Sequence, residues 1–287
     1  MRLLFVHGRA QGGKDPNALK QVWLKSLEEG LAIAGTSLPT GVTVDFPFYG
    51  DVLDAEVERL AAPNRNEVSA MGSGENDAYS RFMVSVLTEV QKNASLSDAE
   101  IRSEMDSDVG AMGPENWEWV QAIVKVLDKR FPGLTSLTFE VFLRDVFLYL
   151  TSRTMRRKIN KIIEAELTNE PTVVVSHSLG TVVCYDILKD RNFQNVKGLI
   201  TLGSPLGIKG VSGHLGLLRH VSPKREWLNA YDERDIVALN PLDEEYFPVN
   251  PRISNNNRLK NKTDNRHGIV GYLDDPSIAR KIVEMMS

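Results

Sequence analysis

The sequence predicts an α/β protein with a mostly parallel central sheet flanked by helices. Three short apolar runs, which are typical of buried parallel strands, support this prediction: Leu3–Val6, Thr172–Val175, which is rich in β-branched residues, and Val196–Leu202. Each run is followed by a turn that contains glycine, and segments with helical periodicity lie between the runs. The chain has 287 residues, of which 42% are hydrophobic and 25% charged, and this suits one large α/β domain over 1–287.

The first fifty residues predict a βαβ unit. Leu3–Val6 forms the first strand, and the Gly-rich segment 7–13 ends it. Pro16 suits the first turn of a helix over Pro16–Ala34, in which Leu19, Trp23 and Leu27 are among the residues that form an apolar face. The second strand is predicted over Val42–Phe48, which makes the sheet parallel.

The residues from about 51 to 168 predict a helical cap inserted into the α/β domain. A bare βα repeat needs far fewer residues than separate the second strand from Thr172. Helices are predicted over Tyr79–Gln91, Asn116–Arg130 and Met155–Leu167, with loops at 63–66 and 71–77 and a strongly apolar stretch over Phe139–Leu150. The large side chains that either line a substrate pocket or form the core of the cap are Met105, Met112, Trp117, Trp119, Phe139, Phe142 and Phe147.

The most informative stretch is Ser176-His177-Ser178-Leu179-Gly180, which joins a predicted strand directly to a predicted helix. The residues two before and two after Ser178 are small, as a tight strand-to-helix turn requires. Ser176 occupies the first of these two small positions, where glycine is usual. The pattern is therefore S-x-S-x-G instead of G-x-S-x-G. The alternative is an ordinary turn in which Ser178 only caps the helix.

These five residues, with their flanking strand and helix, resemble the nucleophile elbow of the α/β-hydrolase family, and more narrowly of its lipase-like and esterase-like serine hydrolases. The turn Gly203-Ser204-Pro205 after the next strand also resembles one in lipase-like members. The resemblance implies an α/β-hydrolase fold with an inserted cap and Ser178 as the nucleophile.

The same resemblance implies the other catalytic residues. The segment 229–238 resembles the acid turn of lipases, which maps the catalytic acid to Asp235, with Asp232 as the alternative. His267, on a loop just before the last predicted helix, corresponds to the general base. The order Ser178, Asp235, His267 is that of the family.

A serine hydroxyl is a weak nucleophile at neutral pH, so it needs a base to take its proton and an acid to orient that base. The resemblance also implies that backbone N–H groups bind the oxyanion: that of Leu179, and that of Arg9 or Ala10, which follow a strand ending in His7-Gly8 as in the family. Each is worth about 3 kcal/mol. The expected substrate is a small-molecule ester with an apolar acyl group or a lipid-like ester, cleaved without a cofactor. A thioesterase or amidase would use the same residues, and a non-catalytic binding protein with this fold is the alternative from another class.

Composition and the spacing of residues also bear on nucleic-acid, metal and phosphate binding and on disulfides. The net charge of −4 implies no nucleic-acid binding, and the single cysteine, Cys184, excludes an internal disulfide. The histidines lack metal-ligand spacing, so no metal site is expected. Gly8–Lys14 partly matches a phosphate-binding loop, but Asp15 stands where serine or threonine would hold magnesium.

We expect neither a membrane span nor a signal peptide, and hence a cytoplasmic protein, because the apolar runs are too short. The basic residues between Arg153 and Lys161 form either a solvated helix face or a transient contact with an anionic membrane surface.

Overall fold

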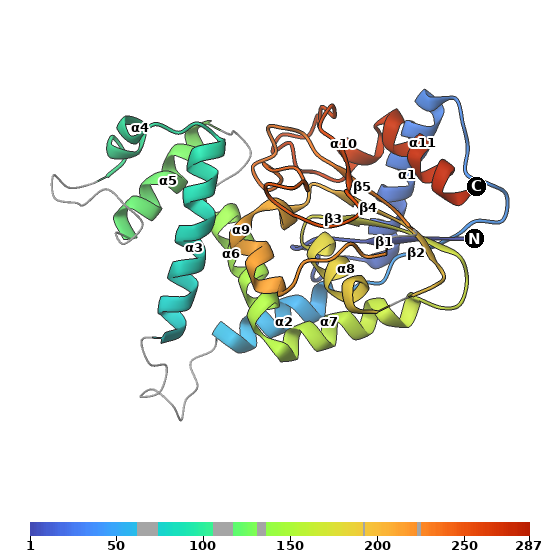
Figure 1. Ribbon diagram of the computed structural model, residues 1–287, viewed down its shortest axis with the longest axis horizontal. Helices are drawn as coiled ribbons and strands as arrows, with labels where there is room; N and C mark the ends of the chain where they lie inside the picture. Colours follow the sequence, from blue (N-terminus) through green and yellow to red (C-terminus); the bar gives the residue numbers. More distant parts are fainter. Residues whose placement is uncertain (62–73, 106–116, 131–135, 192, 223–224) are drawn as a thin grey trace.

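The computed structural model describes residues 1–61, 74–105, 117–130, 136–191, 193–222 and 225–287. It is an α/β structure with one six-stranded sheet, all of whose strands run parallel, in the order β2-β1-β3-β4-β5-β6 (Figure 1). The strands are β1 (Arg2–Val6), β2 (Thr43–Asp45), β3 (Thr172–His177), β4 (Val196–Leu202), β5 (Glu226–Ala230) and β6 (Ser254–Asn256).

Two strands differ from their sequence predictions, and both lie at sheet edges. β2 covers only Thr43–Asp45 of the predicted Val42–Phe48. The polar and basic composition of the segment 250–265 predicts a surface loop, and this prediction is wrong at Ser254–Asn256, which form β6. An edge strand needs little apolar character because one side of it has no neighbour and its side chains are largely exposed.

The central strands are buried on both faces, and their alternate residues pack into two separate hydrophobic cores. Leu3 and Phe5 of β1 pack with α1 (Pro16–Ala34), α10 (Val270–Leu273) and α11 (Pro276–Met286). Leu4 and Val6 pack on the other face, over which lie α2 (Gly50–Ala61), α7 (Arg153–Glu166) and α8 (Leu179–Asp190). The sheet is therefore the middle of three layers (Figure 1).

The helices of the range predicted as a cap fall into two groups. α2 and α7 run along the sheet layer, whereas α3 (Gly74–Asn93), α4 (Asp98–Arg102) and α5 (Trp117–Arg130) extend beyond the carboxyl ends of the strands (Figure 1). α6 (Ser136–Thr151) packs against α3, α5 and α7, and α9 (Lys209–Ser212) packs against α3. The sequence predicts α5, α7 and most of α3 but misses α2 and α4. Its loop at 63–66 and the first part of its loop at 71–77 lie outside the described residues. The rest of that loop prediction is wrong, because α3 begins at Gly74.

The strand order reverses direction at β1, because the chain goes from β1 to β2 on one side and returns to β3 on the other. Loops that leave neighbouring strands in opposite directions open a crevice at the carboxyl ends of those strands. The loop after β1 and the turn after β3 border this crevice, and they contain Gly8–Asp15 and Ser178. No helix in the described part of the chain is both long enough and apolar enough to cross a bilayer.

Candidate functional site

Ser178 occupies a strained backbone conformation between β3 and α8. Its φ of 55° and ψ of −127° lie where residues other than glycine are rare. Two glycines make room for this turn: a Cβ on Gly180 would lie 2.4 Å from the carbonyl oxygen of His7, and one on Gly8 would lie 2.8 Å from Ser178 Cβ. The buried Ser176 fits the turn by donating its hydroxyl to the carbonyl oxygen of Ile200 at 3.2 Å. The backbone therefore holds the Ser178 side chain in one orientation at the edge of the sheet.

The imidazole of His267 lies between Ser178 and Asp235. His267 Nδ1 is 2.7 Å from Asp235 Oδ2, and His267 Nε2 is 2.8 Å from Ser178 Oγ. Because a carboxylate only accepts hydrogen bonds, Nδ1 carries the proton and Nε2 accepts from the serine hydroxyl. This is the arrangement in which an imidazole can remove a proton from serine.

Asp235, rather than Asp232, faces His267. Asp235 is fully buried, and its other oxygen, Oδ1, accepts from the backbone N–H of Val237 at 2.9 Å. The carboxylate of Asp232 instead accepts from the backbone N–H groups of Asn261 at 2.8 Å and Arg234 at 2.9 Å. Asp232 thus holds the loop that leads to His267, and it is a structural neighbour of the site.

Two further histidines lie near Ser178, and both form hydrogen bonds with backbone groups. His177 Nε2 donates to the carbonyl oxygen of His267 at 2.7 Å, and the two rings lie 4.7 Å apart. Burial, with the nearby His267 ring, holds the pKa of His177 well below its usual value, so His177 is neutral. His7 Nε2 accepts from the backbone N–H of Tyr49, and Nδ1 donates to the carbonyl oxygen of Gly8 at 2.6 Å. Burial lowers the pKa of His7 to about 4.

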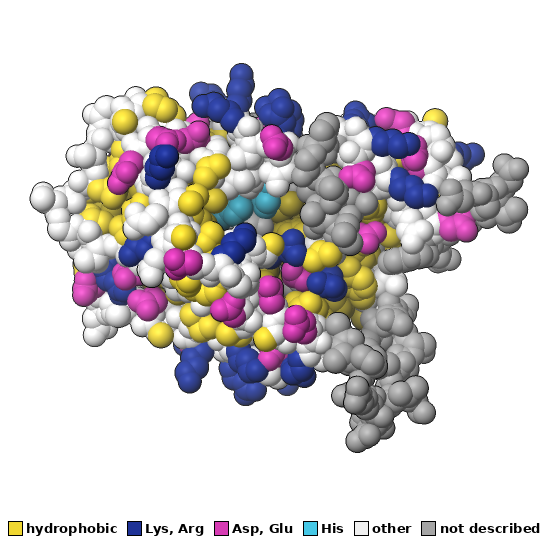
Figure 2. Space-filling view, turned by 180° about the vertical axis from the view of Figure 1, so that it is seen from behind, with side chains coloured by type: hydrophobic (Ala, Val, Ile, Leu, Met, Phe, Trp, Pro, Cys, Tyr) yellow, Lys and Arg dark blue, Asp and Glu magenta, His cyan; other side chains and the backbone are white. Residues whose placement is uncertain are grey.

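A cavity of about 340 Å³ opens onto Ser178 and His267. Arg9 and Ala10 line it, so the structure brings two of the predicted oxyanion residues to the same cavity as the serine. Ala10 has a φ of 58°, a second strained backbone position beside Ser178. Leu179 begins α8, where backbone N–H groups have no acceptor within the helix. Figure 2 shows histidine side chains recessed between hydrophobic and basic side chains on this face.

The apolar wall of this cavity comes mainly from α1, which the sequence did not indicate. Leu19, Val22 and Trp23 line it, together with Ile269 and with Phe142 of α6. Of the side chains that the sequence offered as pocket lining, Trp119, Phe139 and Phe147 are buried in the core, and Met105 packs against that core. Met112 and the side chain of Trp117 lie outside the described residues. Amphipathic periodicity cannot reveal which turn of α1 faces a cavity, because core and pocket residues share one face.

Acidic side chains surround the Gly-rich loop that partly matches a phosphate-binding loop. Asp51 Oδ1 accepts from the backbone N–H of Gly13 at 2.7 Å, and Asp54 lies against Gly12. A phosphate cradle needs such N–H groups unoccupied and the potential positive. These contacts therefore weigh against nucleotide binding at this loop.

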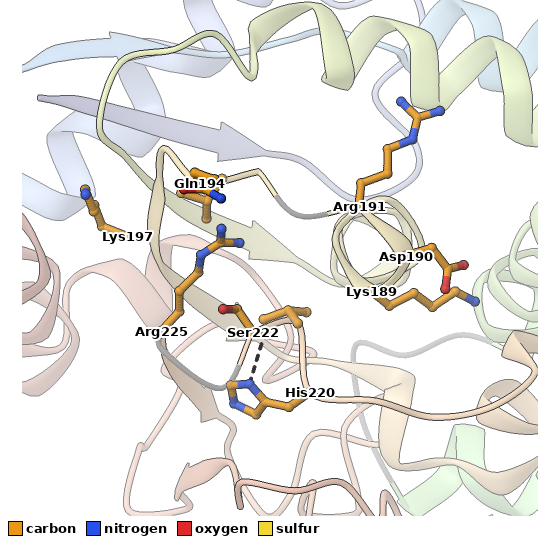
Figure 3. Close-up of a pocket in the computed structure, with 10 residues that line it drawn as sticks. Lys189, Asp190, Arg191, Gln194, Lys197, His220, Ser222 and Arg225 are labelled. Atoms are coloured by element: carbon orange, nitrogen blue, oxygen red, sulfur yellow. Dashed lines mark hydrogen bonds between the residues drawn. The ribbon is translucent and has the colours of Figure 1, made fainter.

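A larger hollow of about 600 Å³ lies at the other end of α8, by the start of β4 (Figure 3). Its cations point in different directions, and two of them have partners elsewhere: Lys189 donates to the carbonyl oxygen of Leu215 at 2.6 Å, and Arg191 pairs with Glu164 at 2.8 Å. His220 Nδ1 accepts from the backbone N–H of Ser222 at 3.2 Å, the dashed line in Figure 3. The charged side chains around the hollow do not converge on one point, and the hollow is remote from Ser178.

Two of the basic residues of α7 have partners within the molecule. Arg156 contacts the carbonyl oxygen of Leu150 at 2.5 Å, and Lys158 bonds to Glu56 of α2. Contact of this helix with a membrane surface stays a prediction. Among the described residues, no group of three or more histidine, cysteine, aspartate or glutamate side chains could hold a metal ion.

No protein-family model and no curated protein matches the sequence. A function for this chain is consequently inferred from the geometry around Ser178.

Proposed function

We propose that this chain is a serine hydrolase of the α/β-hydrolase type that cleaves carboxylic esters. The observation that carries the proposal is the position of the His267 ring, which bridges Ser178 Oγ at 2.8 Å and the buried Asp235 Oδ2 at 2.7 Å. A protein that only binds a partner has no need for such a chain of hydrogen bonds at a strained serine.

The reaction proceeds in two halves. Ser178 Oγ attacks the ester carbonyl carbon while its proton passes to His267 Nε2, and the carbonyl oxygen becomes an oxyanion. His267 then gives this proton to the leaving alkoxide as the C–O bond breaks, which leaves the acyl group on Ser178. Water attacks the acyl-enzyme and gives its proton to His267. His267 then returns a proton to Ser178 Oγ as the bond between Oγ and the acyl carbon breaks, which releases the acid and free Ser178.

The backbone N–H groups of Leu179 and of Arg9 or Ala10 bind the oxyanion in this proposal. Supporting it, Arg9 and Ala10 line the same cavity as Ser178, and the backbone of Gly8 lies against the Ser178 side chain. Aimed N–H groups that bind charge only in the transition state each contribute about 3 kcal/mol to catalysis.

The substrate is an ester with an apolar acyl group of short or medium length. A cavity of about 340 Å³, lined by Trp23, Leu19 and Phe142, is within the size range of small-molecule sites. Thioesters and amides are attacked by the same groups and are the neighbouring substrate classes. Long lipid chains would extend beyond a cavity of this volume.

The test is hydrolysis of p-nitrophenyl esters, from acetate to long acyl chains, by wild type, Ser178→Ala and His267→Ala. We expect a short- or medium-chain optimum and at least about a thousandfold loss of kcat in both variants. The matched control is His214→Ala, which removes an exposed histidine.

Covalent labelling provides a second readout. A fluorophosphonate should label wild type at Ser178 and leave Ser178→Ala unlabelled. Activity that survives Ser178→Ala contradicts the mechanism, and an inactive wild type that also resists the label favours the non-catalytic alternative.

A further inference from the structure

The carboxylate of Asp235 accepts hydrogen bonds from three groups, and two of them share one oxygen. Oδ2 accepts from His267 Nδ1 at 2.7 Å and from the phenol hydroxyl of Tyr272 at 2.6 Å, while Oδ1 accepts from Val237 N–H. Both Asp235 and Tyr272 are fully buried. The oxygen that faces the histidine is thus also bound, from the other side, by a tyrosine.

The direction of the tyrosine hydrogen bond is fixed by its surroundings. The hydroxyl oxygen of Tyr272 accepts from the backbone N–H of Asp232 at 3.3 Å, and a carboxylate can only accept, so the phenol proton points at Asp235. Burial and the adjacent Asp235 charge raise the pKa of Tyr272 well above its usual value. Tyr272 therefore keeps its proton and remains a donor at neutral pH.

Tyr272 is also held in place by its position in the chain. It lies in α10, which begins three residues after His267, and its ring is 6.0 Å from that of His177. The loop that carries His267 and the helix that carries Tyr272 consequently converge on one carboxylate oxygen. The phenol prevents this carboxylate from rotating away from the imidazole.

We propose that Tyr272 is a positioning residue that sets the proton affinity of His267 through Asp235 Oδ2. The inference rests on the proposed function. The phenol takes up part of the negative charge on Oδ2, so the carboxylate stabilises an imidazolium less than it would alone. His267 then stays neutral, and able to accept the proton of Ser178, at a lower pH than it would without Tyr272.

Other titratable and charged side chains act on His267 and do not contact the Tyr272 hydroxyl. His177 of β3 lies with its ring 4.7 Å from that of His267, and His7 and Arg9 of the loop after β1 line the same cavity. Asp145 of α6 pairs with Arg9, and after β5 Arg234 pairs with the carboxylate of Asp232. His177 and His7 are neutral near pH 7 because burial lowers the pKa of each.

The test is Tyr272→Phe, which removes the hydroxyl and keeps the ring. We expect the acid limb of kcat/KM against pH to move up by roughly half a unit to one unit, because the full carboxylate charge now faces the imidazole. At pH values above that limb, kcat should fall less than tenfold and KM should stay unchanged. An acid limb that does not move overturns the proposal.

The matched control is Tyr149→Phe. Tyr149 is equally buried, and its hydroxyl also lies near a carboxylate, 3.2 Å from Asp186 Oδ2, on the opposite face of the sheet. A general loss of rigidity would affect both variants, whereas the proposal predicts a shift only for Tyr272→Phe. Equal shifts in the two variants contradict it.

Two measurements separate this inference from the proposed function. Titration of the His267 ring by NMR needs no turnover, and its midpoint should rise in Tyr272→Phe even if no ester is cleaved. If Tyr272→Phe does not fold, replacement of the seven tyrosines by 3-fluorotyrosine keeps the hydroxyl and makes it a stronger donor. The midpoint should then fall relative to unlabelled wild type, and an unchanged midpoint overturns the inference.

Discussion

Arg9 and Asp145 form an ion pair that joins the loop after β1 to α6. Arg9 Nε donates to Asp145 Oδ2 at 2.6 Å, and the Asp145 side chain is only 3% exposed. Arg9 lines the cavity beside Ser178 and belongs to the proposed oxyanion loop. The helix that supplies Phe142 to the cavity wall thereby also anchors this loop.

Replacing Asp145 by asparagine should weaken both stability and catalysis. The variant leaves the guanidinium of Arg9 partly buried without its charge partner, which costs about 2 kcal/mol after allowance for the exposed part of Arg9. We expect kcat to fall more than KM changes, because the oxyanion is bound only in the transition state. Urea unfolding and ester kinetics measure the two effects.

The control for this variant is Glu244→Gln. Glu244 pairs with Arg252 at 2.5 Å, but both side chains are more than two-thirds exposed, at 71% and 78%. Exposed pairs contribute little, so this change should cost less than about 0.5 kcal/mol. Equal costs in the two variants would show that the Arg9–Asp145 pair has no special role.

Substitution of Gly8 should abolish activity while the protein remains folded. An alanine Cβ would lie 2.8 Å from Ser178 Cβ and 3.3 Å from its Oγ, so either the serine or the oxyanion loop must move. A displacement of about 1 Å can cost about a hundredfold in rate. Gly213→Ala, where an added Cβ meets nothing within 4 Å, should leave kcat unchanged. The proposed position of the loop is wrong if Gly8→Ala retains full activity.

Acid should destabilise the protein through His7. Its pKa is about 4 in the folded state, against a reference of 6.5, because burial disfavours the charged ring. As the pH falls from about 6.5 to 4, the unfolded chain binds this proton first, so stability is lost in that window. The full loss from this one group is about 3 kcal/mol.

The measurement is the free energy of unfolding of wild type and His7→Gln at pH 7.5 and pH 4.5. The variant should show a smaller difference between the two pH values, and some difference should persist because the pKa of His177 is also lowered by burial. The exposed His214→Gln substitution should keep the wild-type difference. An unchanged difference in His7→Gln would mean that the buried ring does not control acid stability.

The sequence predicts the central strands and the long helices well. The helix over Pro16–Ala34 and the strand over Val196–Leu202 have the predicted ends, because Pro16 and the apolar runs mark them. The helix Gly50–Ala61 was missed, although Leu53, Val57 and Leu60 recur at helical spacing, because acidic residues dilute the pattern. The edge strand Ser254–Asn256 has no signal at all, since its residues are polar.

For the site, sequence motifs predict the residues but not the contacts between them. Ser178, Asp235 and His267 each follow a strand or lie on a late loop, and the structure brings their side chains together. Tyr272 and the cavity-lining turn of α1 belong to no motif. They reach the site only through packing between segments far apart in the chain, which periodicity cannot report.

The position of β1 inside the sheet has a consequence for the order in which the protein folds. β1 pairs with β3 at Arg2 and Thr172, roughly 170 positions apart in the chain. A ribosome must therefore add roughly 170 residues after β1 before β3 can pair with it, and long-range strand pairing is slow to form. Until then, Leu4 and Val6 lack their covering layer, and the edge of β1 that β3 will occupy is open to other strands. The strand that borders the crevice is thus open to pairing with other strands while the intervening residues are made, and an open strand edge of this kind favours aggregation of the nascent chain.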